Sequence, residues 1–253
     1  MTFELWSIWH FLYILSSPLI FVGLYFLVKN RSERVKVTVG IVLGAISLFI
    51  LLLRNVDIFF RQGWDLEVIP LQVCHIGNIV TGLALILRKK WLFLTSFCFN
   101  LVPAFLATVF ADSLANYDTL LKIRPQTYVW GHILIIVCAL YGVFVLLPKF
   151  EKRDLTIAIS FVASLSVVAI VCNSAFRALL GWEPNYFYLY NYKGTPLKFL
   201  YNALPTSVYG WFSINWFYTL TLFTVFVGVF IGLYFLAKWL ISLLDKHTDK
   251  IEE

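Results

Sequence analysis

The sequence predicts an all-α, polytopic membrane protein, a bundle of seven transmembrane helices. Of its 253 residues, 60% are hydrophobic and only 13% are charged, and the mean hydropathy is +0.83. An ordinary soluble domain has about 25% charged residues, so this composition excludes a soluble enzyme or nucleic-acid-binding domain. The apolar residues also form long segments of about 20 residues, the length at which a helix crosses a bilayer. The alternating segments of about ten residues that are typical of a membrane barrel are absent.

Seven apolar segments follow one another along the chain, and we expect each to be a span. They cover approximately residues 5–28, 35–53, 68–87, 91–110, 128–147, 155–175 and 217–244. The third and the sixth contain the most polar residues. The first is too long for the apolar core of a secretory signal, and no small-residue cleavage site follows it. We therefore interpret it as a retained span.

The longest connection, at about residues 176–216, predicts a capping segment. It contains several glycines and prolines, and five aromatic residues lie between positions 186 and 192. This stretch is too long for a tight turn and too aromatic for a disordered linker, which favours a re-entrant or interface-lying cap. No internal repeat or separate soluble domain is visible, so residues 1–253 are expected to form a single transmembrane domain.

The basic residues predict the orientation of the bundle. Thirteen of the 20 lysines and arginines belong to one set of loops and to the C-terminal tail, and the opposite set has seven. Because cytoplasmic loops are enriched in basic residues, the N-terminus is expected outside and the C-terminus inside. The net charge of +6 then reflects membrane orientation, and no nucleic-acid partner is expected. We expect a multi-pass protein of a cell membrane, specifically a bacterial plasma membrane.

Four cysteines lie within or beside the expected spans. Cys98 and Cys138 are surrounded by apolar residues, where a thiol behaves as a small hydrophobic group. Cys172 adjoins Asn173, and its sequence setting is ambiguous. No pair of cysteines has the spacing of zinc ligands, and no nucleotide-binding motif occurs. The sequence therefore predicts no metal site and no cofactor.

Cys74 differs from the other cysteines in its setting. Pro70 suits the first turn of a helix, which places Cys74 near a helix N-terminus, where the helix dipole favours a thiolate. Asn78 and Thr81 follow on the same helical face. A polar stripe inside a membrane faces a cavity or a neighbouring helix, and both interpretations of this stripe stay open.

His132 is the best candidate for a base that acts on Cys74. It lies about one turn into the fifth span, at a depth similar to that of Cys74, and a helix N-terminus disfavours its protonated form. His10, in the first span, belongs to the same outer layer, whereas His75 lies about 100° around its helix from Cys74. The alternative is that some of these polar residues snorkel or cap helices.

A cysteine and a histidine can form a nucleophile–base pair. The histidine accepts the thiol proton, the thiolate attacks an acyl carbonyl, and a thioester forms. The expected depth of Cys74 and His132, about 6–9 Å below the helix ends, corresponds to the ester level of a phospholipid. Transport sites more often lie near the midplane of the membrane, so the depth favours lipid-ester chemistry.

Three motifs indicate a resemblance to a known family. They are Pro70-Leu71-x-x-Cys74, then His132, then Asn185-Tyr186-x-x-Leu189 after the sixth span. In their order and spacing the chain resembles the YwaF-type bacterial integral membrane proteins. That family looks homologous to the animal transmembrane acyltransferase that makes polyunsaturated ether phospholipids.

This resemblance implies a seven-helix membrane acyltransferase. Cys74 would be its nucleophile and His132 its general base, and Asn185 and Tyr186 would belong to a cap over the site. The chain departs from the family at Lys193-Gly194-Thr195-Pro196, which replaces a tighter Lys-Pro. The resemblance therefore does not predict the shape of the cap, or the selectivity for an acyl chain or headgroup that depends on it.

Three functions compete at this point. The first is an acyltransferase or transacylase that acts on phospholipid or lysophospholipid in the outer leaflet. The second is a small-molecule transporter or substrate-binding membrane protein with a polar site near the outer face. The third is a non-catalytic bundle; a retinal-binding one is disfavoured because the last span lacks a mid-membrane lysine.

Membrane phospholipids or lysophospholipids are the expected partners under the first function. Acyl donor, acceptor, reaction direction and oligomeric state are left open. The candidate substrate-binding residues are His10, Asn78, Asn173, Arg177, Asn185 and Tyr186.

Overall fold

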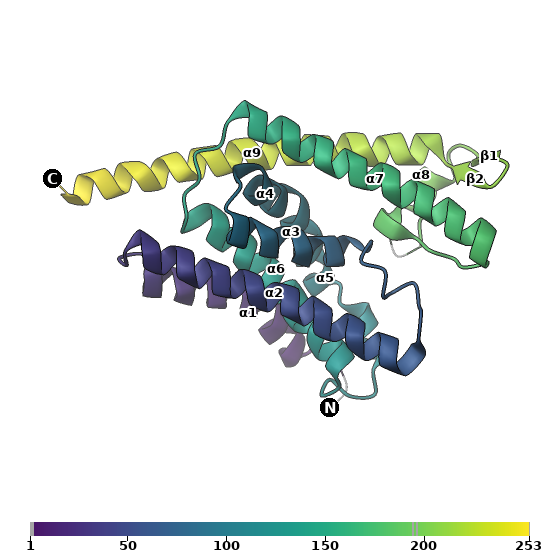
Figure 1. The fold of residues 1–253 in the computed structure, drawn as a ribbon, viewed down its shortest axis with the longest axis horizontal. Helices are drawn as coiled ribbons and strands as arrows, with labels where there is room; N and C mark the ends of the chain where they lie inside the picture. Colours follow the sequence, from purple (N-terminus) through teal and green to yellow (C-terminus); the bar gives the residue numbers. More distant parts are fainter. Residues whose placement is uncertain (1–2, 194, 196, 253) are drawn as a thin grey trace.

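The structure is a computed structural model that describes residues 3–193, 195 and 197–252, with side chains as far as residue 244. Its elements form a bundle of helices with a small cap at one end (Figure 1). In chain order they are α1 (Ile8–Val28), α2 (Glu33–Gln62), α3 (Val73–Leu87), α4 (Lys90–Thr95), the π-helical turn η1 (Ser96–Asn100), α5 (Leu101–Val109), η2 (Asp112–Asn116), α6 (Ile123–Phe144), α7 (Lys152–Leu180), η3 (Tyr186–Tyr188), α8 (Lys198–Tyr201), β1 (Ser207–Tyr209), β2 (Phe212–Ile214) and α9 (Trp216–Glu252).

Six helical segments of the described chain are long and apolar enough to cross a membrane. They are α1, α2, the continuous α4–η1–α5 segment, α6, α7 and α9 through Leu244. The remaining apolar helix, α3, has 15 residues and is about 22 Å long at 1.5 Å per residue, shorter than the roughly 30 Å core of a bilayer. The protein is therefore a multi-pass membrane protein with six full-length candidate spans and one shorter helix.

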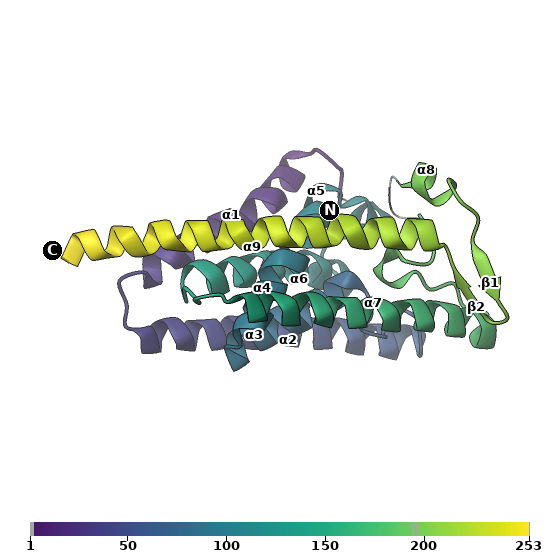
Figure 2. The same cartoon turned by 90° about the horizontal axis from the view of Figure 1, so that it is seen from above.

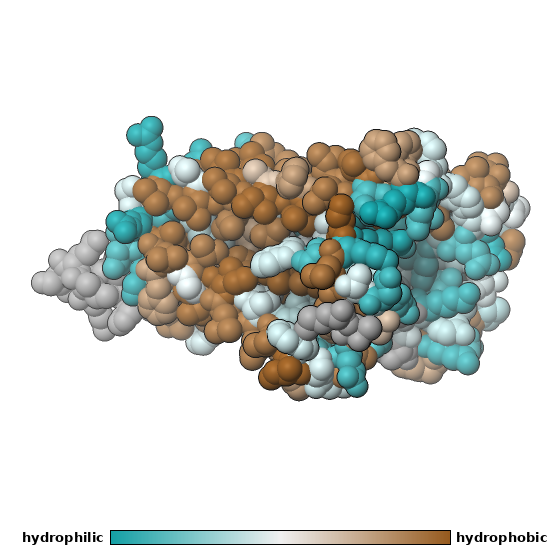
Figure 3. Space-filling model, turned by 90° about the horizontal axis from the view of Figure 1, so that it is seen from below, coloured by the Kyte–Doolittle hydropathy of each residue, from teal (hydrophilic) through white to brown (hydrophobic). Residues whose placement is uncertain are grey.

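The helices are arranged in layers. In Figure 1, α7 and α9 run along one side of the bundle, α1 and α2 along the other, and α3, α4 and α6 lie between them. Viewed from above, α9 runs beside α7 and extends beyond the bundle at its C-terminal end (Figure 2). The face opposite to α9 is covered largely by apolar side chains, and its polar residues gather mainly at the end away from the C-terminus (Figure 3).

The contact between α2 and α3 depends on two glycines. A Cβ atom on Gly44 would lie 2.7 Å from the carbonyl oxygen of Gly82, and a Cβ on Gly82 would lie 2.9 Å from that of Gly44. Both distances are too short for any larger residue without a shift of the backbone. Small residues at helix contacts are typical of membrane proteins, because they allow close packing where no hydrophobic effect drives association.

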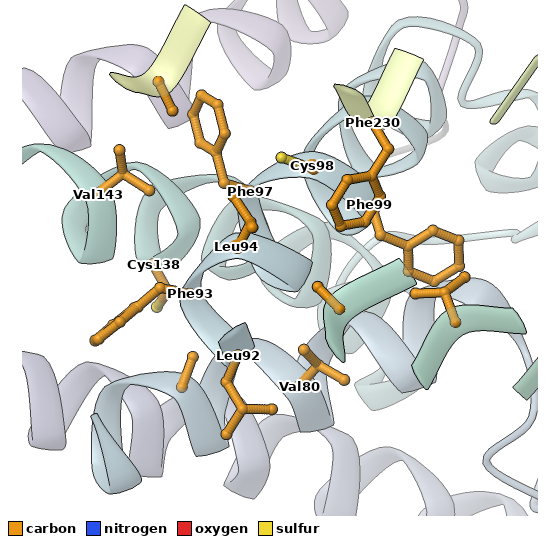
Figure 4. Close-up of a cluster of buried hydrophobic side chains, with 14 of the residues drawn as sticks. Val80, Leu92, Phe93, Leu94, Phe97, Cys98, Phe99, Cys138, Val143 and Phe230 are labelled. Atoms are coloured by element: carbon orange, nitrogen blue, oxygen red, sulfur yellow. The ribbon is translucent and has the colours of Figure 1, made fainter. Parts of the chain in front are cut away.

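The bundle core explains two of the cysteines. Cys98 and Cys138 are 2% and 1% exposed, and they lie among Phe93, Phe97 and Val143 (Figure 4). The expectation that both behave as small core hydrophobes is confirmed.

The loops between the helices lie at two ends of the bundle, and ion pairs and hydrogen bonds connect neighbouring segments at each end. At one end, Lys90 forms a 2.7 Å ion pair with Glu151, and the Tyr141 hydroxyl donates to the Lys36 carbonyl at 2.7 Å. The Lys90 ammonium holds the pKa of the Glu151 carboxyl below its usual value. At the other end, Arg54 and Arg124 both pair with Glu67. Which end faces the outside stays a prediction.

Several expected boundaries are wrong. Helix α6 begins at Ile123, before the expected start at residue 128, so His132 lies nine residues, or about two and a half turns, into the helix and not near its N-terminus. Helix α3 begins at Val73, so Pro70 precedes it and does not occupy its first turn. The cause is a set of turns before the helix, in which Val68 N–H donates to Asp65 O and Leu71 N–H donates to Ile69 O.

The cap is also shorter than expected, because α7 continues to Leu180 and ends at Gly181, whose φ is +64°. Residues 176–180 of the expected cap are therefore helical. The rest of the segment contains η3, α8 and the antiparallel β1–β2 hairpin, in which Ser207 faces Ile214.

Candidate functional site

Cys74 lies in the first turn of α3, at the contact between α3 and α6. Its side chain packs against the small cluster of Ala104, Ile135 and Ile136. Ile135 and Ile136 lie one helical turn beyond His132 on α6, so the structure places the cysteine and the histidine in the same part of this contact. No hydrogen bond joins them within the described residues.

Helices α3 and α6 run in the same direction. A Cβ atom on Gly131 would contact the Asn78 side chain, and one on Gly142 would contact Leu85. Both helices therefore begin at the same end of the bundle, as the expected topology requires. This places Cys74, in the first turn of α3, and His132, nine residues into α6, at similar depths.

The ring of His132 has one fixed and one free nitrogen. Nδ1 lies 2.7 Å from the carbonyl oxygen of Tyr128. A carbonyl can only accept a hydrogen bond, so Nδ1 must have the proton. In the neutral ring Nε2 then has a lone pair, and no hydrogen bond of the described residues uses it. The Tyr128 ring, 4.3 Å away between centroids, also fixes the orientation of the imidazole. This is the arrangement that a general base requires.

His10 has no free nitrogen. The Trp6 N–H donates to its Nδ1 at 2.9 Å, and its Nε2 donates to the Thr108 carbonyl at 2.9 Å. The ring is 0% exposed. His10 therefore links α1 to α5 through backbone groups, and it would have to break one of these hydrogen bonds to contact a substrate.

A charged cluster near the start of α3 was not predicted from the sequence. Arg54 donates to the carbonyl of Glu67 at 2.9 Å and to its carboxylate at 2.6 Å, and Arg124 pairs with the same carboxylate oxygen. The cluster connects the end of α2, the loop before α3 and the start of α6. A signal was present, since Glu67 directly precedes the third apolar segment, where a carboxylate at the edge of a span needs a partner.

His75 lies in the first turn of α3, beside Cys74 in the sequence. It is 2% exposed, and its Nδ1 has no hydrogen-bond partner in the described structure. Because it interacts electrostatically with Arg54 and His132, it belongs to the same polar region.

The polar stripe of α3 forms hydrogen bonds with other helical residues. The Asn78 side chain donates to the Cys74 carbonyl at 3.0 Å and accepts from Ser47 on α2 at 2.9 Å. Thr81 accepts from Ser96 on η1 at 2.8 Å. Of the two interpretations of this stripe, these contacts correspond to a polar seam between helices, and a substrate would have to compete for the Asn78 amide.

Asn173 and Tyr186 fasten the cap to the bundle. The Asn173 amide donates to the Tyr186 carbonyl at 3.0 Å and its oxygen accepts from the Tyr186 N–H at 2.8 Å. The Tyr186 hydroxyl donates to the Leu66 carbonyl at 3.0 Å, in the loop before α3. Asn185 holds the turn that follows, by accepting from the N–H of Tyr190.

Arg177 lies at the surface near the cap. Its guanidinium stacks over the ring of Tyr190 at 5.1 Å from the centroid. Arg177 is therefore held against the cap. Gly194 and Pro196, where the chain departs from the family pattern, lie outside the described residues.

A cavity of about 460 Å³ lies between η1, α7, α9 and the cap. Its lining is largely apolar, and it includes Val73, the residue before Cys74, and Tyr188 from the cap. Tyr188 also lies close enough to Cys74 for an electrostatic interaction. The cavity therefore reaches the neighbourhood of the candidate nucleophile. No group of three described His, Cys, Asp or Glu residues is placed to hold a metal ion.

Comparison with protein families identifies the chain at the level of family. A family model, described as the TMEM164 family, matches residues 5–235. The chain belongs to the TMEM164 family. The match includes all of the candidate site residues and every described element from α1 through most of α9. No curated protein and no solved structure matches the chain. TMEM164 proteins are a membrane protein family, in agreement with the apolar helices.

Proposed function

We propose that the protein is an acyltransferase or transacylase that acts on phospholipid or lysophospholipid in the outer leaflet of a bacterial plasma membrane. The observation that supports this most is the state of His132. Its Nδ1–H is held by a backbone carbonyl and its Nε2 is free, in the part of the α3–α6 contact that also contains Cys74. Of the two buried histidines predicted to belong to the site, it alone has the geometry of a base.

The reaction begins when Nε2 of His132 accepts the proton of the Cys74 thiol. The thiolate attacks the ester carbonyl of a phospholipid, and a thioester to Cys74 forms as the carbon–oxygen bond of the ester breaks. His132 returns the proton to the leaving lysophospholipid oxygen. An alcohol of a second lysophospholipid, or water, then gives its proton to His132, attacks the thioester and regenerates the thiol.

The surroundings of the pair suit a lipid substrate. Cys74 is in the first turn of its helix, close to the end of the bundle at which Glu67 pairs with two arginines. Basic side chains at the membrane surface attract the phosphate of lipid headgroups. The apolar cavity beside Val73 offers space for a hydrocarbon chain.

The test is mass spectrometry of the protein after incubation in vesicles of phosphatidylethanolamine and phosphatidylglycerol with isotope-labelled acyl chains. We expect an acyl adduct on the Cys74 peptide of the native chain and none in Cys74→Ala. His132→Ala should lower the rate of acylation by roughly 10²–10⁴-fold, the usual contribution of a general base. Cys172→Ala, at the other half-buried cysteine, is the matched control and should retain the rate. No adduct, with equal lipid turnover in all variants, would overturn the proposal.

A second candidate is a transporter or substrate-binding membrane protein. The observation that favours it is the buried ring of His75, which interacts with the Ile69 backbone but whose Nδ1 has no partner in the described structure. An ionisable group inside a membrane often marks a binding site or a proton path. Uptake of a solute into proteoliposomes that survives Cys74→Ala and is abolished by His75→Ala would favour this function over acyl transfer.

A further inference from the structure

The apolar cavity has a polar end and a hydrocarbon end. Along α9, Tyr218 and Thr219 line it near the cap, and Phe226 lines it about two turns deeper. On the facing helix α7, Val162 also lines the deep part. At 1.5 Å per residue, Phe226 lies about 12 Å along the helix from Tyr218. Tyr188 of the cap also lines the cavity. This distribution of polar and apolar lining residues is complementary to an amphipathic ligand.

Two of the hydroxyls at the polar end are buried and have no partner. Tyr218 is 0% exposed and Thr219 is 8% exposed. The Thr219 hydroxyl has no hydrogen-bond partner within the described residues, and the Tyr218 hydroxyl lies near the Thr195 side chain without the geometry of a full hydrogen bond. Buried hydroxyl groups are normally paired, because an unpaired one loses its hydration without compensation. A ligand oxygen in the cavity would supply the acceptor that both lack.

The cavity opens toward the lipid-facing surface of two spanning helices. Val167 on α7 and Leu220 on α9 both line it, and they are 60% and 58% exposed. These helices lie on the same side of the bundle and cross each other in the view of Figure 1. A hydrocarbon chain in the bilayer can therefore enter between them without crossing water.

We propose that this cavity binds one acyl chain of a membrane phospholipid, with an ester oxygen at the hydroxyls of Tyr218 and Thr219. The chain lies between Val162 and Phe226, and the glycerol end points toward the cap. The binding of a lipid chain in this cavity does not depend on the proposed acyl transfer. Only the role of that chain as the acyl group exchanged at Cys74 rests on the proposed function. The cavity then holds the acyl chain that Cys74 receives or releases, since Val73 is part of its wall.

The cavity assignment can be tested without catalysis, in the Cys74→Ala background. The probe is a phosphatidylethanolamine with a diazirine in the distal half of one acyl chain, mixed into vesicles of phosphatidylethanolamine and phosphatidylglycerol. After irradiation, we expect labelled peptides from the deep lining of α7 and α9. Ala163→Trp fills the cavity and should reduce labelling of the α9 lining to the background level. Ser164→Trp adds the same bulk at the neighbouring exposed position of α7 and should leave that labelling unchanged.

The role of the hydroxyls is tested by substitutions in a chain that keeps Cys74. The measurement is how readily a competing lipid displaces the bound phospholipid from the cavity. Tyr218→Phe should weaken the retention of the phospholipid by about fivefold, the effect of one neutral hydrogen bond. Tyr234→Phe is the matched control, because Tyr234 also has a buried, unpaired hydroxyl on α9 but does not line the cavity. It should leave retention unchanged.

The outcomes separate this inference from the proposed function. Equal labelling of the α9 lining in Ala163→Trp and Ser164→Trp, or labelling by a diazirine-bearing free fatty acid in preference to the phospholipid, would overturn the cavity assignment even if Cys74 forms a thioester. Labelling that is lost only in Ala163→Trp supports the assignment, even if no thioester forms on Cys74.

Discussion

Two histidines of this chain show how hydrogen bonding decides the role of a single residue. The ring of His10 uses both nitrogens for backbone groups, whereas that of His132 uses one. Replacing His10 with alanine leaves the Thr108 carbonyl and the Trp6 N–H without their partner in a buried place. We expect His10→Ala to lower the free energy of unfolding by about 2–4 kcal/mol, measured by denaturant titration in detergent micelles.

The same substitution should leave acyl transfer per folded molecule close to that of the native chain. His132→Ala should behave in the opposite way, with a small effect on stability and a large loss of rate. A His10→Ala protein that folds normally but has lost its activity would contradict this division and would place His10 in contact with the substrate.

The sequence predicts the burial of residues better than their pairing. The apolar neighbours of Cys98 and Cys138 were sufficient to place both in the core. The difference between His10 and His132 was not predictable, because Thr108 is 98 positions from His10 in the sequence. Partners that meet only through the tertiary fold leave no local pattern.

Among the elements, the cap depends on a small number of hydrogen bonds. Asn173 on α7 makes two of them with the backbone of Tyr186, and it is 1% exposed. Asn173→Ala removes both and leaves the backbone groups of Tyr186 unpaired. We expect the cap to open more often, by a free-energy change of about 2–3 kcal/mol, seen as faster proteolysis between residues 181 and 215.

The matched control for this prediction is Asn202→Ala, because Asn202 is exposed within the cap itself. It should leave the cleavage rate nearly unchanged. Equal rates for Asn173→Ala and the native chain would mean that apolar contacts, such as the stacked rings of Phe99 and Phe187, hold the cap by themselves.

Helices were predicted well as elements, and their ends were predicted less well. Long apolar segments in the sequence predict α1, α2, α6 and α9. The third expected span is shorter in the structure, because turns precede Val73. The start of α7 has a capping box of Glu151 and Asp154, a local signal that the sequence does contain. The π-helical turn η1 (Ser96–Asn100), inside the continuous span from Lys90 to Val109, was not predicted from the sequence.

At the scale of the whole molecule, the number of crossings depends on α3. Its 15 residues are too few for the full hydrocarbon thickness, so a crossing at this point requires the loop at 63–72 to occupy the remaining depth. That loop is fixed at several points, by Arg54 and Arg124 through Glu67 and by the Tyr186 hydroxyl through Leu66. Irregular backbone at membrane depth is tolerated where protein surrounds it. Seven crossings are therefore physically consistent with a short α3.

Cysteine labelling distinguishes seven crossings from six. In a Cys74→Ala, Cys172→Ala background, we expect Gln62→Cys and Asp118→Cys to react with a membrane-impermeant maleimide in intact cells. Lys89→Cys should react only after permeabilisation, because α3 separates it from residue 62. All three positions are exposed, and loss of the Asp118–Lys122 ion pair is a small perturbation at the surface. Labelling of residues 62 and 89 from the same side would show that α3 does not cross, and the two termini would then lie on the same side of the membrane.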